Sequence, residues 1–247
     1  MLNRAVESNQ LSYVIKHNMY QHFYQPLYRL QRQCLVGYEA LLRSEPPISP
    51  EGLFRFAEKT NRLYQLDTES ILLACASFSS SDRIKRDAEL FLNIFPSTLV
   101  HPFFGSLLEE MVSNHAVLRI RIVFELGESE VIRDMGALRD AISCLHENGF
   151  RIAIDDVGKG MFSLQKILEL EPDFIKLDRY FASDICRLIN KQRMISLFVA
   201  YCEEGTQLIL EGIETSEDLA MAKHLGVHIG QGFILGRPGS LENVPVA

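Results

Sequence analysis

Charged side chains stand where apolar runs end in the stretch 151–181. The run 152–154 closes on Asp155 and Asp156, and the run 174–177 contains Lys176 and closes on Asp178. Continuous apolar runs of this length are typical of parallel strands that are covered on both faces. Enzymes built on parallel strands place their reactive groups at the carboxyl ends of those strands. The stretch therefore predicts one wall of an active site.

Other apolar runs carry polar groups in the same way. Taken alone, Glu39 could be a strand-edge carboxylate that faces water, and Asn93 could be a structural hydrogen-bonding group. Together, ten such groups on one rim are hard to explain as independent surface residues. They are Glu39, Asn93, Glu125, Asp155, Asp156, Lys176, Asp178, Glu211, Glu214 and Gln231. We expect them to form a single site.

This set of groups points to cation chemistry. Carboxylates crowded on one rim repel one another unless a cation lies between them, and hard oxygen ligands select Mg²⁺ or Mn²⁺, or Ca²⁺ in a roomier cage. Two such ions about 3.5–4 Å apart suit in-line attack on a phosphodiester. Lys176 could hold the attacking water or take part in proton transfer. Arg43 could hold a substrate phosphate or lie on the surface, and its type alone does not decide between these roles.

The elements that must position these groups alternate along the chain. Expected strands lie at 22–30, 37–43, 89–95, 120–126, 151–156, 174–178 and 207–211, with a short one near 230, and the first two form a hairpin. Expected helices begin at Ser49-Pro50 and span 62–79, 101–113, 129–148, 164–170, 184–204 and 216–225. Short connections between strands and helices predict an α/β fold, a (β/α)8 TIM-like barrel in a single domain.

Length and composition agree with this architecture. The chain has 247 residues, close to the roughly 250 of one barrel, and we expect an N-terminal arm or helix at 1–19 before a barrel domain at 20–247. Its net charge of −7 argues against a partner that is a nucleic-acid polymer. Five scattered cysteines and the lack of a signal-like or membrane-spanning run predict a soluble, cytoplasmic protein without membrane contact.

Several motifs resemble the EAL domain family of bacterial cyclic di-GMP phosphodiesterases. The signature-like GYEALLR at 37–43 is accompanied, in the order of the family, by YQP at 24–26, FLNIF around Asn93, FELGE at 124–128, IDDVGKG at 154–160, IKLD at 175–178, EGIE at 211–214 and QGF at 231–233. The resemblance covers about 20–238. It implies a barrel that hydrolyses cyclic di-GMP to linear pGpG with Mg²⁺ or Mn²⁺, and with Ca²⁺ as an inhibitor.

The resemblance also implies residue roles. It implies metal ligands at Glu39, Asn93, Glu125, Asp155, Asp156 and Glu211. Catalytic groups would be Glu39, Asp156, Glu211 and Lys176, the last associated with the attacking water. Groups that hold substrate or support the site would be Gln25, Arg43, Asp178, Glu214 and Gln231. Glu128, Gly158 and Gly160 would support the loop after the paired aspartates, which the family ties to its dimer interface and to control of activity.

That loop departs from the usual pattern of the family. The family usually reads DDFGTGYSSL, whereas this chain reads DDVGKGMFSL at 155–164, with Val157 and Lys159 among the differences. The alternative function is therefore a catalytically weak or inactive protein that acts as a cyclic di-GMP receptor or a protein-interaction module. A barrel hydrolase that acts on other phosphodiesters is a further alternative. We also expect a homodimer and, since 1–247 contains no sensor domain, a regulatory protein partner.

Overall fold

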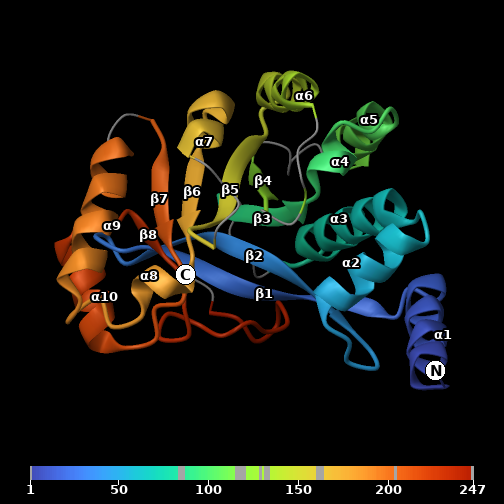
Figure 1. Ribbon diagram of the computed structural model, residues 1–247, viewed down its shortest axis with the longest axis horizontal. Helices are drawn as coiled ribbons and strands as arrows, with labels where there is room; N and C mark the ends of the chain where they lie inside the picture. The colour runs from blue at the N-terminus through green and yellow to red at the C-terminus, as the bar shows by residue number, and fades with distance from the viewer. Residues whose placement is uncertain are drawn as a thin grey trace.

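The computed structural model describes residues 2–82, 87–114, 121–127, 130, 134–159, 164–202 and 205–245, with the backbone alone at 2–8 and 114. Within these residues, eight strands close into a barrel in sequence order, with helices around it (Figure 1). The fold is the predicted (β/α)8 TIM-like barrel.

The barrel departs from an all-parallel arrangement at its first strand. Strand β1 is antiparallel to both β2 and β8, and the remaining neighbours are parallel. The predicted hairpin of the first two strands is thereby confirmed. The strands are β1 (Tyr20–Arg29), β2 (Cys34–Ser44), β3 (Glu89–Ile94), β4 (Ile122–Leu126), β5 (Arg151–Val157), β6 (Phe174–Leu177), β7 (Gln207–Leu210) and β8 (Ile229–Gly230).

Helices surround the outside of these strands, and α1 lies at one end of the molecule beside α2 (Figure 1). The helices are α1 (Leu2–Lys16), α2 (Pro50–Lys59), α3 (Leu63–Ser79), α4 (Pro96–Leu99), α5 (Phe104–Asn114), α6 (Met135–Glu147), α7 (Leu164–Leu170), α8 (Arg179–Ala182), α9 (Ile189–Tyr201) and α10 (Ser216–His224). Val14 and Ile15 of α1 are buried in a cluster with Leu53 of α2. Across the described part of the chain, no helix is both long enough and apolar enough to cross a bilayer.

Capping groups explain where several helices begin and end. The Ser49 hydroxyl accepts a hydrogen bond from the Gly52 amide at 3.1 Å, which starts α2 at Pro50 as predicted. The helix predicted over 129–148 is not continuous, because α6 begins at Met135, where extended Asp134 caps it by accepting from the Ala137 amide at 2.9 Å; residues 129 and 131–133 lie outside the described residues. The prediction over 184–204 is also too long, since α9 begins only at Ile189 after the separate turn α8.

The interior of the barrel is filled by one apolar layer. One buried residue from each of the eight described strands joins this cluster, which we call the inner layer. Its members are Leu27, Val36, Phe91, Val123, Ala153, Phe174, Ile209 and Ile229. The rings of Phe91 and Phe174 meet edge-on with centroids 5.3 Å apart. The barrel is therefore a packed core, and the inner layer forms the floor beneath the rim at its open end.

Candidate active site

The predicted site residues lie on the rim directly above the inner layer. Side chains alternate between the two faces of a strand, so a residue two positions beyond an inward-facing residue also faces inward. Lys176 is two positions beyond Phe174, and Glu125 is two positions beyond Val123. The same step leads from the inner layer to Asn93, Asp155, Glu211 and Gln231. Gln25 lies two positions before Leu27, because β1 runs in the opposite direction.

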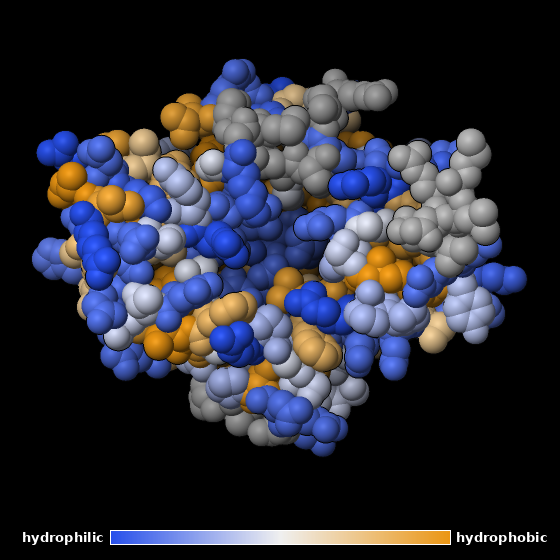
Figure 2. Space-filling model, turned by 60° about the horizontal axis from the view of Figure 1, so that its bottom comes forward, coloured by the Kyte–Doolittle hydropathy of each residue, from blue (hydrophilic) through white to orange (hydrophobic). Residues whose placement is uncertain are grey.

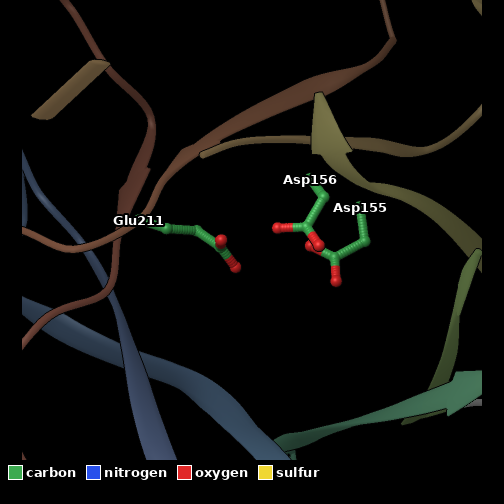
Figure 3. A group of neighbouring side chains, drawn as sticks. All are labelled: Asp155, Asp156 and Glu211. Atoms are coloured by element: carbon green, nitrogen blue, oxygen red, sulfur yellow. The ribbon is translucent and has the colours of Figure 1, made fainter. Parts of the chain in front are cut away.

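Asp156 needs a backbone distortion to reach the same site as Asp155. On a regular strand, adjacent side chains point to opposite faces. Here Asp156 has a left-handed φ of 58°, and the register between β5 and β6 shifts between Ile154 and Val157. As a result, carboxylate oxygens of Asp155, Asp156 and Glu211 lie within 4.8 Å of one another. Figure 3 shows these three groups pointing toward one another, two from the end of β5 and the third from the end of β7, two strands further round the barrel.

Lys176 is the buried centre of the acidic cluster. Its side chain is 0% exposed, and Nζ lies 2.7 Å from Glu125 Oε1 and 2.8 Å from Glu211 Oε1. Nζ also lies 3.2 Å from Asp155 Oδ1 and 3.5 Å from Glu39 Oε2. A buried charge is tolerated when it is paired in this way, and several kcal/mol is the usual cost otherwise. The ammonium holds the four carboxylates in a fixed cluster.

Amide side chains complete the cluster around Glu39. Glu39 is buried, and its Oε2 accepts a hydrogen bond from Gln231 Nε2 at 2.7 Å. Asn93 Nδ2 donates at 3.4 Å to Glu39 Oε1 and at 3.3 Å to Glu125 Oε2. Gln25 accepts from Gln231 Nε2 at 3.3 Å and donates to the Gly236 carbonyl at 3.1 Å. Glu39 therefore does not face water at a strand edge, and Asn93 bridges two carboxylates.

Burial and mutual repulsion shift the proton affinities of this cluster. Burial raises the pKa of Glu125 well above its usual value, with Lys176 acting in the opposite direction. Burial likewise raises the pKa of Glu211 to about 8. The pKa of Lys176 is raised well above its ordinary value, because the surrounding carboxylates outweigh the opposing effect of burial. Shifted pKa values of this kind cluster at functional sites, because charged groups there are buried close to one another.

A second lysine contacts the outer edge of the cluster. Lys159 Nζ lies 2.5 Å from Asp156 Oδ1 and 3.3 Å from Asp178 Oδ2. Asp178 also caps α8 by accepting from the Tyr180 amide at 2.8 Å. Sequence reasoning named Lys159 only as a departure in the loop after the paired aspartates and missed both ion pairs, because they depend on the path of the chain after Asp156. Asp178 therefore pairs with Lys159 and caps α8, in addition to its predicted role in holding substrate.

Two cavities meet at the cluster. The larger measures about 730 Å³ and is lined by Arg43, His22 and Phe54 among others. The smaller measures about 270 Å³, and its walls include Gln25, Asp178, Arg179, Glu211, Glu214, Gln231 and Phe233. Glu39, Asp155, Asp156 and Lys159 line both. Figure 2 shows a hollow with hydrophilic walls at the centre of one face of the molecule.

Arg43 and His22 form part of the wall of the larger cavity. Arg43 is half-buried, and its Nη1 donates to the adjacent Leu42 carbonyl at 2.8 Å. His22 is buried, with Nε2 3.1 Å from Ser70 Oγ. Burial, together with the charge of Arg43, lowers the pKa of His22 to about 4. Sequence reasoning missed His22, Phe54, Arg179 and Phe233 as cavity-lining residues. Alternation on β1 places His22 on the face opposite Gln25, toward Ser70 of α3, so that pattern gave no signal for it.

The loop after the paired aspartates is described only in part. Gly158 has φ of 108°, and a Cβ at this position would lie 2.2 Å from the Phe181 ring, so both conformation and space favour glycine here. Gly232, in the QGF motif, approaches the Ile213 backbone so closely that a Cβ would lie 2.1 Å from its carbonyl oxygen. The predicted loop residues Glu128 and Gly160 lie outside the described residues.

Comparison with known proteins identifies the family to which the chain belongs. The EAL domain family model matches residues 8–238. The chain belongs to the EAL domain family. In sequence it is similar to the bifunctional diguanylate cyclase/cyclic di-GMP phosphodiesterase MucR of Pseudomonas aeruginosa, with 28% identity over 98% of this chain and 35% of the relative. The chain spans about a third of the length of the curated relatives that it matches.

Solved structures agree with the assignment. A complex of BlrP1 from Klebsiella pneumoniae with manganese and cyclic di-GMP is similar over 90% of this chain and 56% of that one, with 29% identity and a TM-score of 0.80. The MucR phosphodiesterase in complex with cyclic di-GMP is similar over 94% of this chain and 98% of that one, with 26% identity and a TM-score of 0.82. The EAL fold therefore extends over nearly the whole chain.

Proposed function

We propose that this EAL domain is a metal-dependent phosphodiesterase that hydrolyses cyclic di-GMP to linear pGpG. The single observation that supports this most directly is the oxygen-donor cluster around buried Lys176. The six predicted ligand positions, Glu39, Asn93, Glu125, Asp155, Asp156 and Glu211, belong to this cluster or border it. The names of the relatives add support, since MucR is a cyclic di-GMP phosphodiesterase and BlrP1 forms a complex with manganese and cyclic di-GMP.

The donor chemistry of the site fits divalent cations. Carboxylate and amide oxygens are the ligands that Mg²⁺ and Mn²⁺ prefer, and those of Asp155, Asp156 and Glu211 already lie within 4.8 Å of one another. Glu39, Asn93, Glu125 and Asp155 would hold one ion, and Asp156 with Glu211 would hold the second. When bound, the ions would activate water and stabilise negative charge on the phosphate. Ca²⁺, which takes the same ligands with less strict geometry, would act as an inhibitor.

The protein groups would position and neutralise the reactants. Lys176 would donate a hydrogen bond to the attacking water and offset the charge that develops on the phosphate oxygens. Gln231 holds Glu39 in its orientation through the 2.7 Å hydrogen bond. Arg43, in the wall of the larger cavity, would bind a phosphate of the substrate. The inner layer below these groups excludes water from the floor of the site.

The shape of the site suits a substrate that extends to both sides of the reacting phosphate. The cavities of about 730 and 270 Å³ meet at Glu39, Asp155, Asp156 and Lys159. A cyclic dinucleotide carries a base on each side of its phosphodiester ring. We infer that one guanosine would enter each cavity, with Gln25, Asp178, Glu214 and Gln231 contacting the part in the smaller one.

A second candidate function is a cyclic di-GMP receptor or protein-interaction module with little or no turnover. The observation that favours it is the ion pair between Lys159 and Asp156, which engages one of the proposed ligands of the second ion. Loss of ligand carboxylates would also have favoured it, but each proposed ligand position has an oxygen-donor side chain. The enzyme is therefore the better supported candidate.

The deciding experiment is incubation of the purified protein with cyclic di-GMP and Mg²⁺ or Mn²⁺, with pGpG followed by chromatography. We expect pGpG to form with either ion and to stop on addition of EDTA. Glu39→Gln is the matched control, because it keeps the size of the side chain and removes its charge. Tight binding of cyclic di-GMP without product would instead support the receptor, and cleavage of simple phosphodiesters at equal rates would support a general hydrolase.

We also propose that the chain is divided into an N-terminal segment at 1–19, which contains helix α1, and the catalytic barrel domain at 20–247. We propose that the domain works as a cytoplasmic homodimer and that a partner protein regulates it. Sedimentation of the purified protein with and without cyclic di-GMP would test the dimer.

A further inference from the structure

Two lysines divide the acidic cluster between them. Among the ion pairs of the described residues, Lys176 contacts Glu39, Glu125, Asp155 and Glu211, whereas Lys159 contacts Asp156. The side chain of Lys176 is fully buried, whereas that of Lys159 is 53% exposed. The first lysine is fixed in the protein interior. The second lies at the solvent side of the cluster and pairs with Asp156 and Asp178.

The backbone after Asp156 directs Lys159 back onto the cluster. The Lys159 amide donates to the Asp156 carbonyl at 3.1 Å, so that the two residues lie at opposite ends of one turn. Asp156 and Gly158 both adopt left-handed φ values, 58° and 108°, within this turn. The ammonium consequently reaches Asp156 and Asp178 at the same time.

The position of the ammonium conflicts with a divalent ion on Asp156. Lys159 lines both cavities at the point where they meet, together with Asp155 and Asp156. An ion bound by Asp156 and Glu211 would share the Asp156 carboxylate with Nζ, and two cations in contact with one carboxylate repel each other. Asp178 offers Nζ a second acceptor on the far side of the turn, at 3.3 Å.

We propose that Lys159 is a tethered counter-ion of Asp156 that must be displaced before the second divalent cation binds. The inference rests on the proposed function for the existence of that ion. The Lys159 ammonium makes binding of the second ion weaker than it would be with the Asp156 and Glu211 carboxylates alone. Because a half-exposed ion pair is weak, a divalent cation can displace Lys159. The lysine therefore lowers the affinity of the second ion but does not prevent its binding.

The first test is equilibrium binding of Mn²⁺, measured by calorimetry and by electron paramagnetic resonance of the free ion, on the intact chain without substrate. We expect two binding steps in the wild type. In Lys159→Gln, the second step should tighten about two- to fivefold and the first should change little. Lys159→Arg should behave like the wild type, because it keeps the charge. Lys16→Gln, at the exposed end of α1, controls for the change in net charge.

The second test is the reactivity of the lysine amine. Acetylation at limiting reagent, read by mass spectrometry, should label Lys159 several-fold faster with saturating Mn²⁺ than with EDTA, while labelling of Lys16 should stay unchanged. The inference is overturned if Lys159→Gln leaves the second step unchanged or weaker, if neither protein binds a second ion, or if Mn²⁺ leaves the labelling of Lys159 unchanged.

These readouts separate the inference from the proposed function. Tighter second-ion binding in Lys159→Gln, in a protein that forms no pGpG, would support the counter-ion and refute the phosphodiesterase. Formation of pGpG by a protein in which Lys159→Gln leaves the affinity for the second Mn²⁺ unchanged would support the phosphodiesterase and refute the counter-ion.

Discussion

Replacing Lys176 by methionine tests the role of the buried cation directly. The substitution keeps an unbranched side chain of similar length and removes the ammonium that pairs with Glu39, Glu125, Asp155 and Glu211. Removing one partner of a buried ion pair costs about 3–5 kcal/mol, because the remaining charges lose their compensation. For a chain of this size, each kcal/mol lowers Tm by about 2–4 °C. We therefore expect Tm to fall by roughly 10 °C in EDTA at pH 8.

The dependence on pH and metal distinguishes this mechanism from simple loss of packing. Burial already raises the pKa values of Glu125 and Glu211, the latter to about 8, and removing Lys176 should raise both further. Protonation at pH 6 would then relieve the repulsion, so the deficit in Tm should shrink as the pH falls. Mn²⁺ at pH 8 should restore part of the loss by supplying another cation.

Thermal melts followed by circular dichroism measure these changes, with Lys16→Met as the control for an exposed lysine. A fall of less than about 2 °C at pH 8 in EDTA, against the expected 10 °C, would refute the reasoning. A deficit that is equal at pH 6 and pH 8 and indifferent to Mn²⁺ would show that packing, not charge, was lost.

Three further predictions follow. Glu39→Gln should lower kcat for cyclic di-GMP at least 100-fold, through loss of a metal ligand, while the Tm in EDTA changes by only a few degrees; near-normal turnover would refute the ligand role. Burial raises the pKa of Asp67 to about 7 in the folded protein, above its unfolded value near 4, so its contribution to stability is lost as the pH rises from about 4 to 7. Asp67→Asn should therefore flatten urea stability between pH 5 and 7.5, and an unchanged slope would contradict the assignment. Phe174→Ala, in the inner layer, should cost about 3–5 kcal/mol in the same urea assay, whereas a loss below about 1 kcal/mol would mean that the barrel collapses onto the space.

The alternation of strand residues made most of the rim predictable. Phe174 with Lys176 and Val123 with Glu125 each combine a buried apolar residue and a charged one on the same strand face, and this pattern is visible in the sequence. A carboxylate within an apolar run needs a partner, which is why Glu39 could be assigned to the site before its contacts with Lys176 and Gln231 were known.

What the sequence could not predict depends on single backbone torsions and on contacts distant along the chain. The left-handed φ of Asp156 turns its carboxylate into the site, but aspartate adopts that conformation only occasionally, so the residue type does not predict it. The ion pairs of Lys159 follow from that torsion. The short helix α4 was also missed, although Pro96 at its first position was a local signal; the contact of the preceding Phe95 amide with Asp67, 28 residues away, was not predictable.

Because the inner layer takes one residue from each of the eight described strands, binding of cations above it should depend on closure of the whole barrel. Its residues come from positions as distant along the chain as Leu27 and Ile229, which meet only when the first and last strands pair. The groups on the rim stand on this floor, so a partly unfolded chain would keep its carboxylates but lose their convergence. Cations would then bind the closed barrel and not its opened forms, and the resulting stabilisation would be global. Amide hydrogen exchange in β1 and β8, far from the paired aspartates in sequence, would slow together with that in β5.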